Sequence, residues 1–304
     1  MADGLERQIS VGLDRHWVKG AGVRLHVRAA GPADGPLVVL LHGFPEFWYG
    51  WRHQIAPLAR AGYRVLVPDQ RGYNRSDAPA DVAAYDLDRL TTDVCHLLDA
   101  ANRERAHVVG HDWGAMVAWT LAMTHPERIG RLGILNVPHP HVFRRTLRTS
   151  PRQLLRSLYA LFFQLPRLPE WLLGRNDGQG LAWLLRASSR PDTFDASDLA
   201  AYRRTWRRPG RLRGMLHWYR AAVRRALRGD HPDAHIDVPT LVLWGAQDVA
   251  LTRQMAAPSA ELCSDGRIVV LEEATHWVQH DAPDTVTRHL LDHLDGAPDR
   301  RSTS

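Results

Sequence analysis

An aspartate, Asp112, lies at the centre of a Gly-His-Asp-Trp-Gly segment at residues 110–114. A β-branched run precedes this segment, and a helix-forming stretch, residues 115–123, follows it. The order is typical of a nucleophile elbow, a tight strand-to-helix turn that exposes one side chain above a sheet. Glycines at both ends leave room for such a turn. The segment therefore predicts that Asp112 is a nucleophile.

A carboxylate nucleophile favours a reaction that a serine would not. Attack on an acyl carbon would give an anhydride, whereas attack on a saturated carbon with a leaving group gives an alkyl ester. Water, activated by a base, can then cleave that ester at the enzyme's own carbonyl carbon. Asp112 thus indicates the opening of an epoxide or the expulsion of a halide. The alternative is that Asp112 only caps the following helix, because aspartate is a favoured N-cap residue.

Two later residues fit the base and the acid that such a nucleophile needs. Asp248 follows the apolar run Thr-Leu-Val-Leu-Trp-Gly, and His276 follows the next run, residues 267–271. The order nucleophile, acid, base is the one found with a nucleophile elbow. Both residues come just after predicted strands, where open α/β sheets assemble their sites. We expect His276 to act as general base on water, with Asp248 orienting its imidazole.

A glycine-containing turn after another predicted strand supplies the fourth element. The sequence Leu-Leu-His-Gly-Phe-Pro-Glu-Phe-Trp occupies residues 40–48. Backbone N–H groups of Phe44 and of Trp113 are the predicted donors to an oxyanion formed when the ester is cleaved.

Short apolar runs separated by helix-sized intervals predict the elements that position these residues. The runs are Val23–Ala29, Leu37–Leu41, Val65–Val67, Ala106–Val109, Leu132–Leu135, Thr240–Trp244 and Ile268–Leu271. This alternation favours crossover units and an α/β fold with a mostly parallel sheet flanked by helices.

The strand pattern is interrupted in the middle of the chain. Between about Pro140 and His235 the apolar spacing is helical and is broken by several prolines. We therefore predict a core formed by residues 1–139 and 236–304, the latter ending in a polar tail, and a helical cap formed by residues 140–235.

Composition points to a single globular enzyme-sized protein of 304 residues with 44% hydrophobic residues. Cys95 and Cys263 match no metal or redox spacing, which favours a reduced compartment. The polar N-terminus carries no hydrophobic signal segment, and no apolar run is long enough to span a membrane. The sequence therefore predicts a cytoplasmic protein.

The net charge of +6 is concentrated in the middle segment, where residues 144–228 hold 19 arginines against five acidic residues. A solvated helical face is the favoured interpretation, because arginine stems also cover apolar surface. A partner surface and a bias toward anionic substrates are the alternatives.

Several segments together resemble the soluble epoxide hydrolases of the α/β-hydrolase superfamily. They are His-Gly-Phe-Pro-Glu-Phe-Trp-Tyr-Gly-Trp-Arg at 42–52, Pro-Asp-Gln-Arg-Gly-Tyr-Asn-Arg-Ser-Asp at 68–77, Gly-His-Asp-Trp-Gly at 110–114, Asn-Val-Pro-His-Pro at 136–140 and Thr-His-Trp at 275–277. The resemblance implies an Asp112, Asp248 and His276 triad, an oxyanion hole at Phe44 and Trp113, and a cis proline at Pro45.

The resemblance also implies two cap tyrosines that hydrogen-bond and protonate the epoxide oxygen. Tyr159, in Leu-Tyr-Ala-Leu-Phe-Phe-Gln-Leu-Pro, and Tyr219, in His-Trp-Tyr-Arg, match these motifs, whereas Tyr202 does not. For each of the two, the alternative is an amphipathic residue that closes the cap over the core. Gln70 and Asn74 vary a loop of the pattern that lies outside the predicted chemistry.

The nearest rival function is a haloalkane or haloacid dehalogenase, which uses the same Asp-His-Asp machinery. A leaving halide needs N–H donors, but Phe44 follows His42-Gly43 where a side-chain donor would be needed, and no arginine stands one or four residues after Asp112. A silent ligand-binding fold would be expected to lose one of the set, and nucleic-acid binding would rest on the arginines alone.

The sequence therefore predicts hydrolysis of a small-molecule epoxide to a vicinal diol, without a metal or organic cofactor. It predicts no nucleic-acid partner and no membrane span. A monomer and a homodimer are both compatible with it.

Overall fold

We describe the protein from a computed structural model, in which residue 5 and residues 9–229 and 235–296 are placed well enough to describe. The polar N-terminal residues and the polar tail discussed above lie almost wholly outside these described residues.

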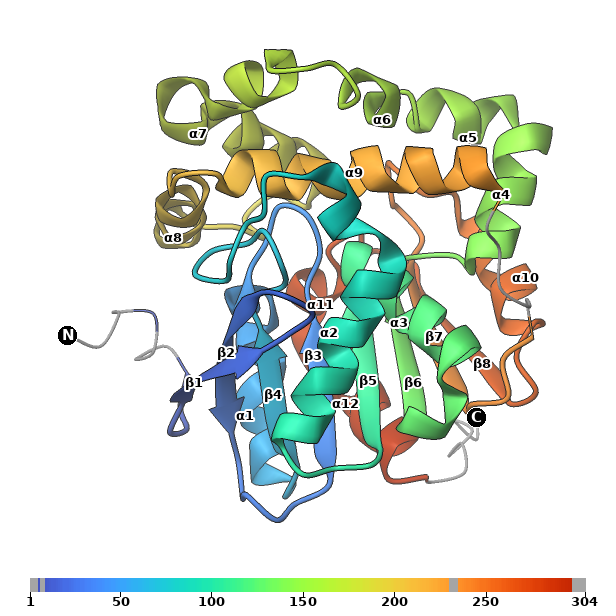
Figure 1. Ribbon diagram of the computed structural model, residues 1–304. Coiled ribbons are helices and arrows are strands. Elements are labelled where there is room, and N and C mark those ends of the chain that lie inside the picture. The colour runs from blue at the N-terminus through green and yellow to red at the C-terminus, as the bar shows by residue number, and fades with distance from the viewer. Residues whose placement is uncertain (1–4, 6–8, 230–234, 297–304) are drawn as a thin grey trace.

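An eight-stranded sheet runs through the centre of the molecule (Figure 1). Its strand order is β1-β2-β4-β3-β5-β6-β7-β8; β2 is antiparallel to β1 and β4, and the remaining neighbours are parallel. The strands are β1 (Asp14–Lys19), β2 (Arg24–Ala30), β3 (Leu37–Leu41), β4 (Arg64–Pro68), β5 (Ala106–His111), β6 (Ile129–Leu135), β7 (Thr240–Gly245) and β8 (Gly266–Leu271). The expected α/β fold with a mostly parallel sheet is confirmed.

Helices cover both faces of the sheet, as parallel sheets require. On one face α2 (Leu87–Ala100) and α3 (Trp113–Thr124) pack side by side, and on the other α1 (Arg52–Arg60) packs against α12 (Pro283–Leu294) (Figure 1). The shorter helices α10 (Ala256–Ala260) and α11 (Val278–Asp281) complete the layers, together with the 3-10 turns η2 (Trp48–Trp51), η3 (Val82–Tyr85), η4 (Pro126–Arg128) and η5 (Arg253–Met255).

All seven predicted strands are present, with ends shifted by a few residues at most. The prediction for β3 matches its bounds, because all five residues of Leu37–Leu41 are buried in the middle of the sheet. An eighth strand, β1, was missed. It is an edge strand with mostly exposed side chains, so its sequence lacks the alternation of apolar and polar residues on which strand prediction depends.

In the described part of the chain between β6 and β7, six helices cross above the carboxyl ends of the strands (Figure 1). We call them the cap helices: α4 (Pro140–Thr149), α5 (Pro151–Arg156), α6 (Tyr159–Phe162), α7 (Leu168–Ser188), α8 (Ala196–Trp206) and α9 (Arg211–Arg228). Non-helical residues 175–178 break α7 into two parts. Their division from the core at residues 140 and 235 stays a prediction.

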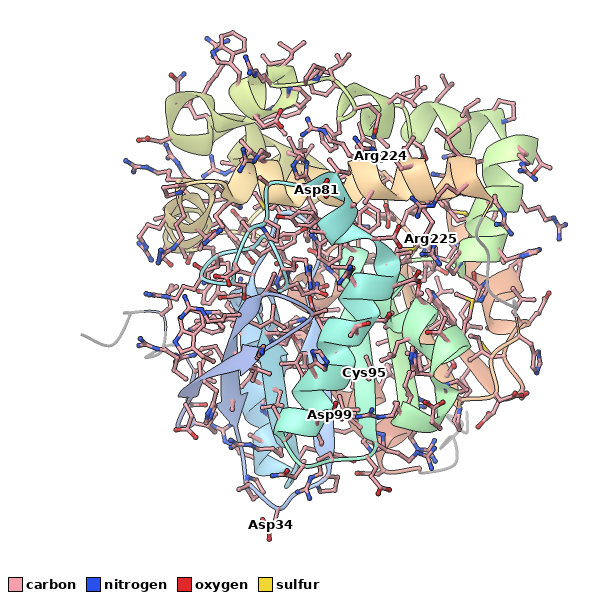
Figure 2. All side chains as sticks on the ribbon, in the orientation of Figure 1. Asp34, Asp81, Cys95, Asp99, Arg224 and Arg225 are labelled. Atoms are coloured by element: carbon pink, nitrogen blue, oxygen red, sulfur yellow. The ribbon has the colours of Figure 1, made fainter. Side chains whose placement is uncertain are left out.

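Some arginines of the arginine-rich middle segment form ion pairs with the core. Arg225 on α9, labelled in Figure 2, contacts Asp86 at 2.6 Å and Asp88 at 2.9 Å, at the start of α2. Asp86 is also the N-cap of α2, since its side chain accepts a hydrogen bond from the Asp88 N–H. These contacts hold the cap helix against the core.

Within the described ranges, no helix has the length and apolar character needed to cross a bilayer.

Candidate active site

Asp112 lies in a strained turn between β5 and α3, as a nucleophile elbow requires. Its backbone angles, φ 50° and ψ −123°, fall in a region that residues other than glycine rarely adopt. It is the N-cap residue of α3 by position, yet its side chain makes no capping hydrogen bond. The side chain is 18% exposed. The helix-cap alternative therefore does not explain this residue.

Two glycines allow the elbow and the neighbouring turn to approach each other. A side chain at Gly43 would collide with the carboxyl group of Asp112, and one at Gly114 would collide with the backbone carbonyl of Leu41. Close backbone approach is thus the reason for glycine at both positions.

The predicted base, His276, lies between Asp112 and the predicted acid, Asp248. The imidazole Nε2 of His276 lies 3.5 Å from Oδ2 of Asp112, and its Nδ1 lies 2.7 Å from Oδ2 of Asp248. Asp248 follows β7, and His276 follows β8, so the parallel strands deliver both to the edge that carries Asp112. The structure therefore brings the three predicted residues together.

Two carboxylates hold His276 in its protonated form. Burial alone would lower the pKa of the imidazole, but the Asp248 charge and the contacts with Asp112 outweigh it and raise the pKa to about 10. For Asp248, burial would raise the pKa of its carboxyl group, but His276 and the hydrogen bond from Asn136 lower it. The resting site thus holds an imidazolium between two carboxylates.

We expect Asp112→Asn to lower the pKa of His276 below its wild-type value of about 10, because one of two neighbouring negative charges is removed. Titration by NMR of protein labelled at histidine nitrogens measures this shift. The chain has 17 histidines, so the signal is assigned by its loss in His276→Gln.

The same substitution should change the pH dependence of stability. A histidine whose pKa is raised from 6.5 to about 10 on folding stabilises the protein fully below pH 6.5, and this contribution is lost as the pH rises toward 10. In Asp112→Asn the loss should still begin near pH 6.5, the unfolded-state pKa, but it should be smaller and should end at a lower pH, because only the folded-state pKa falls. An unchanged His276 pKa would contradict the assignment of the Asp112 charge to this shift.

The predicted oxyanion donors border the carboxylate of Asp112. The Phe44 N–H donates to Oδ1 of Asp112 at 2.6 Å. Trp113 is the first residue of α3, so its N–H has no acceptor within the helix. The Phe44–Pro45 peptide bond is cis, as the sequence resemblance implied.

Tyr159 and Tyr219 lie beside each other above the elbow that carries Asp112. Their ring centroids are 5.9 Å apart, and the Tyr219 ring lies 4.9 Å from Trp113 and 5.4 Å from Phe44. Burial of the hydroxyl ends and the nearby Asp112 charge raise the pKa of both tyrosines, so both remain neutral donors. Tyr219 is 7% exposed and Tyr159 is 42% exposed, so the outer side of the site lies at Tyr159.

Tyr202, which did not match the cap motif, points elsewhere. Its hydroxyl donates to Oε1 of Glu46 at 2.6 Å. Gln70, a departure from the family pattern, contacts the turn before Gly43, since its backbone N–H donates to Nε2 of His42 at 3.0 Å.

Sequence reasoning missed the role of Asn136. Its Nδ2 donates to Oδ2 of Asp248 at 2.8 Å, and its Oδ1 accepts from the Gly245 N–H at 2.8 Å. Asn136 follows directly after β6, with φ 53°. The rule that identified Asp248 and His276, a polar residue just past a strand, would also have found it.

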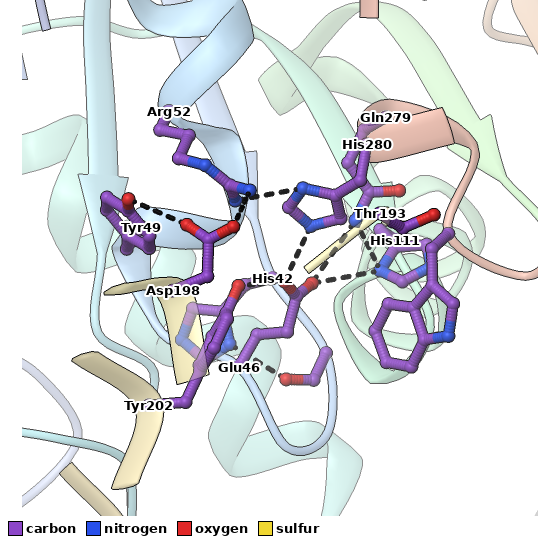
Figure 3. A network of polar contacts seen from close by, with 12 residues as sticks. His42, Glu46, Tyr49, Arg52, His111, Thr193, Asp198, Tyr202, Gln279 and His280 are labelled. Carbon is purple, nitrogen blue, oxygen red and sulfur yellow. Dashed lines mark hydrogen bonds and ion pairs between the residues drawn. The ribbon is translucent and has the colours of Figure 1, made fainter. Parts of the chain in front are cut away.

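A buried polar network next to the elbow was also missed (Figure 3). Glu46 accepts from Tyr202 and contacts His280 at 2.8 Å and His111 at 3.4 Å. Burial would raise the pKa of Glu46, but the two histidines outweigh it and hold the pKa well below its usual range.

The network reaches from the cap to the site. Arg52 of α1 pairs with Asp198 of α8 at 3.0 Å and contacts His280 at 2.9 Å. At the other end, Nε2 of His111, the residue before the nucleophile, lies 2.9 Å from the backbone oxygen of His276. The residue before Asp112 and the backbone of His276 are thus both held by this polar network.

Comparison with known proteins gives the class that this fold and site define. The family described as alpha/beta hydrolase fold matches residues 36–283, so the protein is an α/β hydrolase. It is 44% identical to AB hydrolase superfamily protein YfhM of Bacillus subtilis (strain 168), over 93% of this chain and 98% of that protein. Epoxide hydrolase 4 of Mus musculus is 39% identical over 88% of this chain and 76% of that protein.

A similar solved structure is that of an epoxide hydrolase. Epoxide hydrolase A from Mycobacterium thermoresistibile superposes with a TM-score of 0.80 at 34% identity, covering 94% of this chain and 99% of that chain. The chain belongs to the epoxide hydrolase family of the α/β hydrolases, and it is a hydrolytic enzyme.

Proposed function

We propose that this protein hydrolyses small epoxides to vicinal diols through an alkyl ester on Asp112. The observation that carries the proposal is the position of the Asp112 carboxylate, with one oxygen on the Phe44 N–H and the other 3.5 Å from His276. Relatives from several organisms are named epoxide hydrolases, and this supports the same substrate class.

In the first step, Asp112 attacks one epoxide carbon, and the carbon–oxygen bond of the ring breaks. Tyr159 and Tyr219 hydrogen-bond the ring oxygen, and one of them gives it a proton, because a free alkoxide is a poor leaving group. Their neutral hydroxyls at rest fit this role. The products are an uncharged ester and a tyrosinate, which regains its proton through water.

In the second step, His276 becomes a base. Ester formation removes the charge of Asp112, one of the two that raise the pKa of the imidazole, so His276 releases its proton to solvent. The neutral imidazole then takes a proton from a water that attacks the ester carbonyl. The N–H groups of Phe44 and Trp113 stabilise the oxyanion. On collapse the bond between the carbonyl carbon and the alkyl oxygen breaks, the leaving oxygen takes the proton from His276, and the diol departs. The acid proton left on Asp112 then passes to His276, which restores the resting site.

The origin of the diol oxygen tests this route. In a single turnover in water enriched in heavy oxygen, the diol should be unlabelled, because its new oxygen comes from Asp112, and the peptide that contains Asp112 should gain the label. Mass spectrometry measures both products. Direct attack of water on the epoxide would label the diol in that first turnover and would falsify the ester route.

The proposed substrate is a neutral small molecule, and no step requires a metal or an organic cofactor. A cytoplasmic location and a monomeric or homodimeric state remain predictions of the sequence.

A further inference from the structure

One cap helix, α5, buries one polar side chain completely. Pro151, Arg152, Leu154 and Leu155 are exposed, whereas Gln153 is fully buried. A buried amide is costly unless it is hydrogen-bonded, and apolar packing would not select it. The position therefore indicates a specific polar partner.

That partner is the loop that carries the triad acid, residues 248–252, which we call the acid loop. Nε2 of Gln153 donates to the Ala250 carbonyl at 2.9 Å, and Oε1 of Gln153 accepts from the Thr252 N–H at 3.0 Å. One amide thus satisfies a donor and an acceptor of the same backbone segment, 97 and 99 residues away in the chain.

A second residue of α5 contacts the same loop. Nη1 of Arg156 donates to the backbone carbonyl of Asp248 itself at 3.0 Å. Gln153 and Arg156, which we call the α5 pair, therefore hold the acid loop at Asp248, Ala250 and Thr252.

The backbone of this loop sets the direction of the Asp248 carboxylate. Oδ1 of Asp248 accepts from the N–H groups of Ala250 at 2.7 Å and Leu251 at 2.8 Å. The other oxygen, Oδ2, is left for His276 and Asn136. A shift of the backbone at Ala250 would therefore turn the carboxylate away from the imidazole.

The α5 pair also lies next to the predicted epoxide-activating tyrosine. Arg156 ends α5, and Tyr159 begins α6 three residues later. The segment from Gln153 to Tyr159 is thus fixed to the acid loop at one end and carries the Tyr159 hydroxyl at the other.

We propose that Gln153 and Arg156 are positioning residues that keep the Tyr159-bearing cap segment and the Asp248 carboxylate in register with each other. The inference rests on the proposed function, because it assigns Asp248 and Tyr159 to the two halves of that reaction. It differs from the Glu46 network, which reaches the site through α8 and α11.

The test compares Gln153→Leu and Arg156→Leu with Arg152→Leu, a matched control on the exposed side of the same helix. Arg156→Lys serves as the conservative variant, since one N–H donor to the Asp248 carbonyl is kept. The first readout is the proton NMR resonance of the hydrogen bond between His276 Nδ1 and Asp248, which needs no substrate. The second is the pair of single-turnover rates for formation and hydrolysis of the alkyl-enzyme with styrene oxide.

We expect Gln153→Leu and Arg156→Leu to move this resonance and to slow both steps by tenfold or more, since misplacement of reacting groups by ~1 Å costs up to about 10²-fold. Arg152→Leu should behave as wild type, and Arg156→Lys should recover most of the loss. Lower thermal stability with an unmoved resonance and wild-type rates would overturn the proposal and leave a purely structural role.

Two further outcomes of this experiment can be told apart. If Gln153→Leu does not fold, the comparison of Arg156→Leu, Arg156→Lys and Arg152→Leu decides the question. If the wild type forms no alkyl-enzyme, the proposed function fails; an unmoved resonance in Arg156→Leu overturns the α5 pair independently of that result.

Discussion

The His276→Gln protein, exposed to styrene oxide, should accumulate one alkyl group on Asp112 and lose turnover by roughly 10²- to 10⁴-fold. Glutamine cannot accept a proton from water, so the second step stops while the first remains possible. The approach of Asp112 to the substrate does not require the imidazole, since its Oδ1 is held by the Phe44 N–H. Intact-protein mass spectrometry detects the adduct, and peptide mapping locates it.

Two controls make this result specific. Asp112→Asn in the same background should show no adduct, because an amide is a poor nucleophile. A chloroalkane probe should leave the His276→Gln protein unmodified. An adduct with the chloroalkane alone would assign the site to dehalogenation, and native turnover by His276→Gln would remove His276 from the mechanism.

Removal of both cap hydroxyls should slow the first step, which is formation of the alkyl ester. We expect the double variant Tyr159→Phe/Tyr219→Phe to form alkyl-enzyme roughly 10²- to 10⁴-fold more slowly, the usual contribution of a general acid. Each single variant should lose less, because the neighbouring hydroxyl still reaches the ring oxygen. Rapid quenching followed by mass spectrometry of the His276→Gln background measures the rate of ester formation alone.

Tyr202→Phe is the matched control, since it removes a buried cap hydroxyl that donates to Glu46. Its rate of ester formation should remain near that of the parent. If Tyr202→Phe slowed the step as much as the double variant, the assignment of Tyr159 and Tyr219 would be wrong.

The central strands could be predicted from sequence because burial on both faces imposes continuous apolar runs. β3 is the clearest case, with five buried residues. β1 could not be predicted this way, because an exposed edge strand needs no apolar face; its pairing with β2, from Asp14 with Ala29 to Lys19 with Arg24, is set by backbone hydrogen bonds.

The proximity of Asp112, Asp248 and His276 was predictable, because each follows a parallel strand and such strands end at the same edge of the sheet. Their catalytic roles stay a proposal. Contacts that depend on side-chain direction were not predictable. Gln153 is a polar residue on an exposed helix, and nothing in its local sequence indicates a partner almost one hundred residues later.

The buried network of Figure 3 has a consequence for attempts to change substrate choice by exchanging lids between relatives. Glu46 and Arg52 of the core are completed by Tyr202 and Asp198, both on α8. A transplanted cap without these two partners would leave the buried Arg52 without its carboxylate and Glu46 without one hydrogen-bond donor, and breaking a buried ion pair typically costs about 3–5 kcal/mol. The cap helices therefore cannot be exchanged freely. A chimera must carry a tyrosine at position 202 and an aspartate at position 198 to keep the core stable, whatever its substrate-facing residues are.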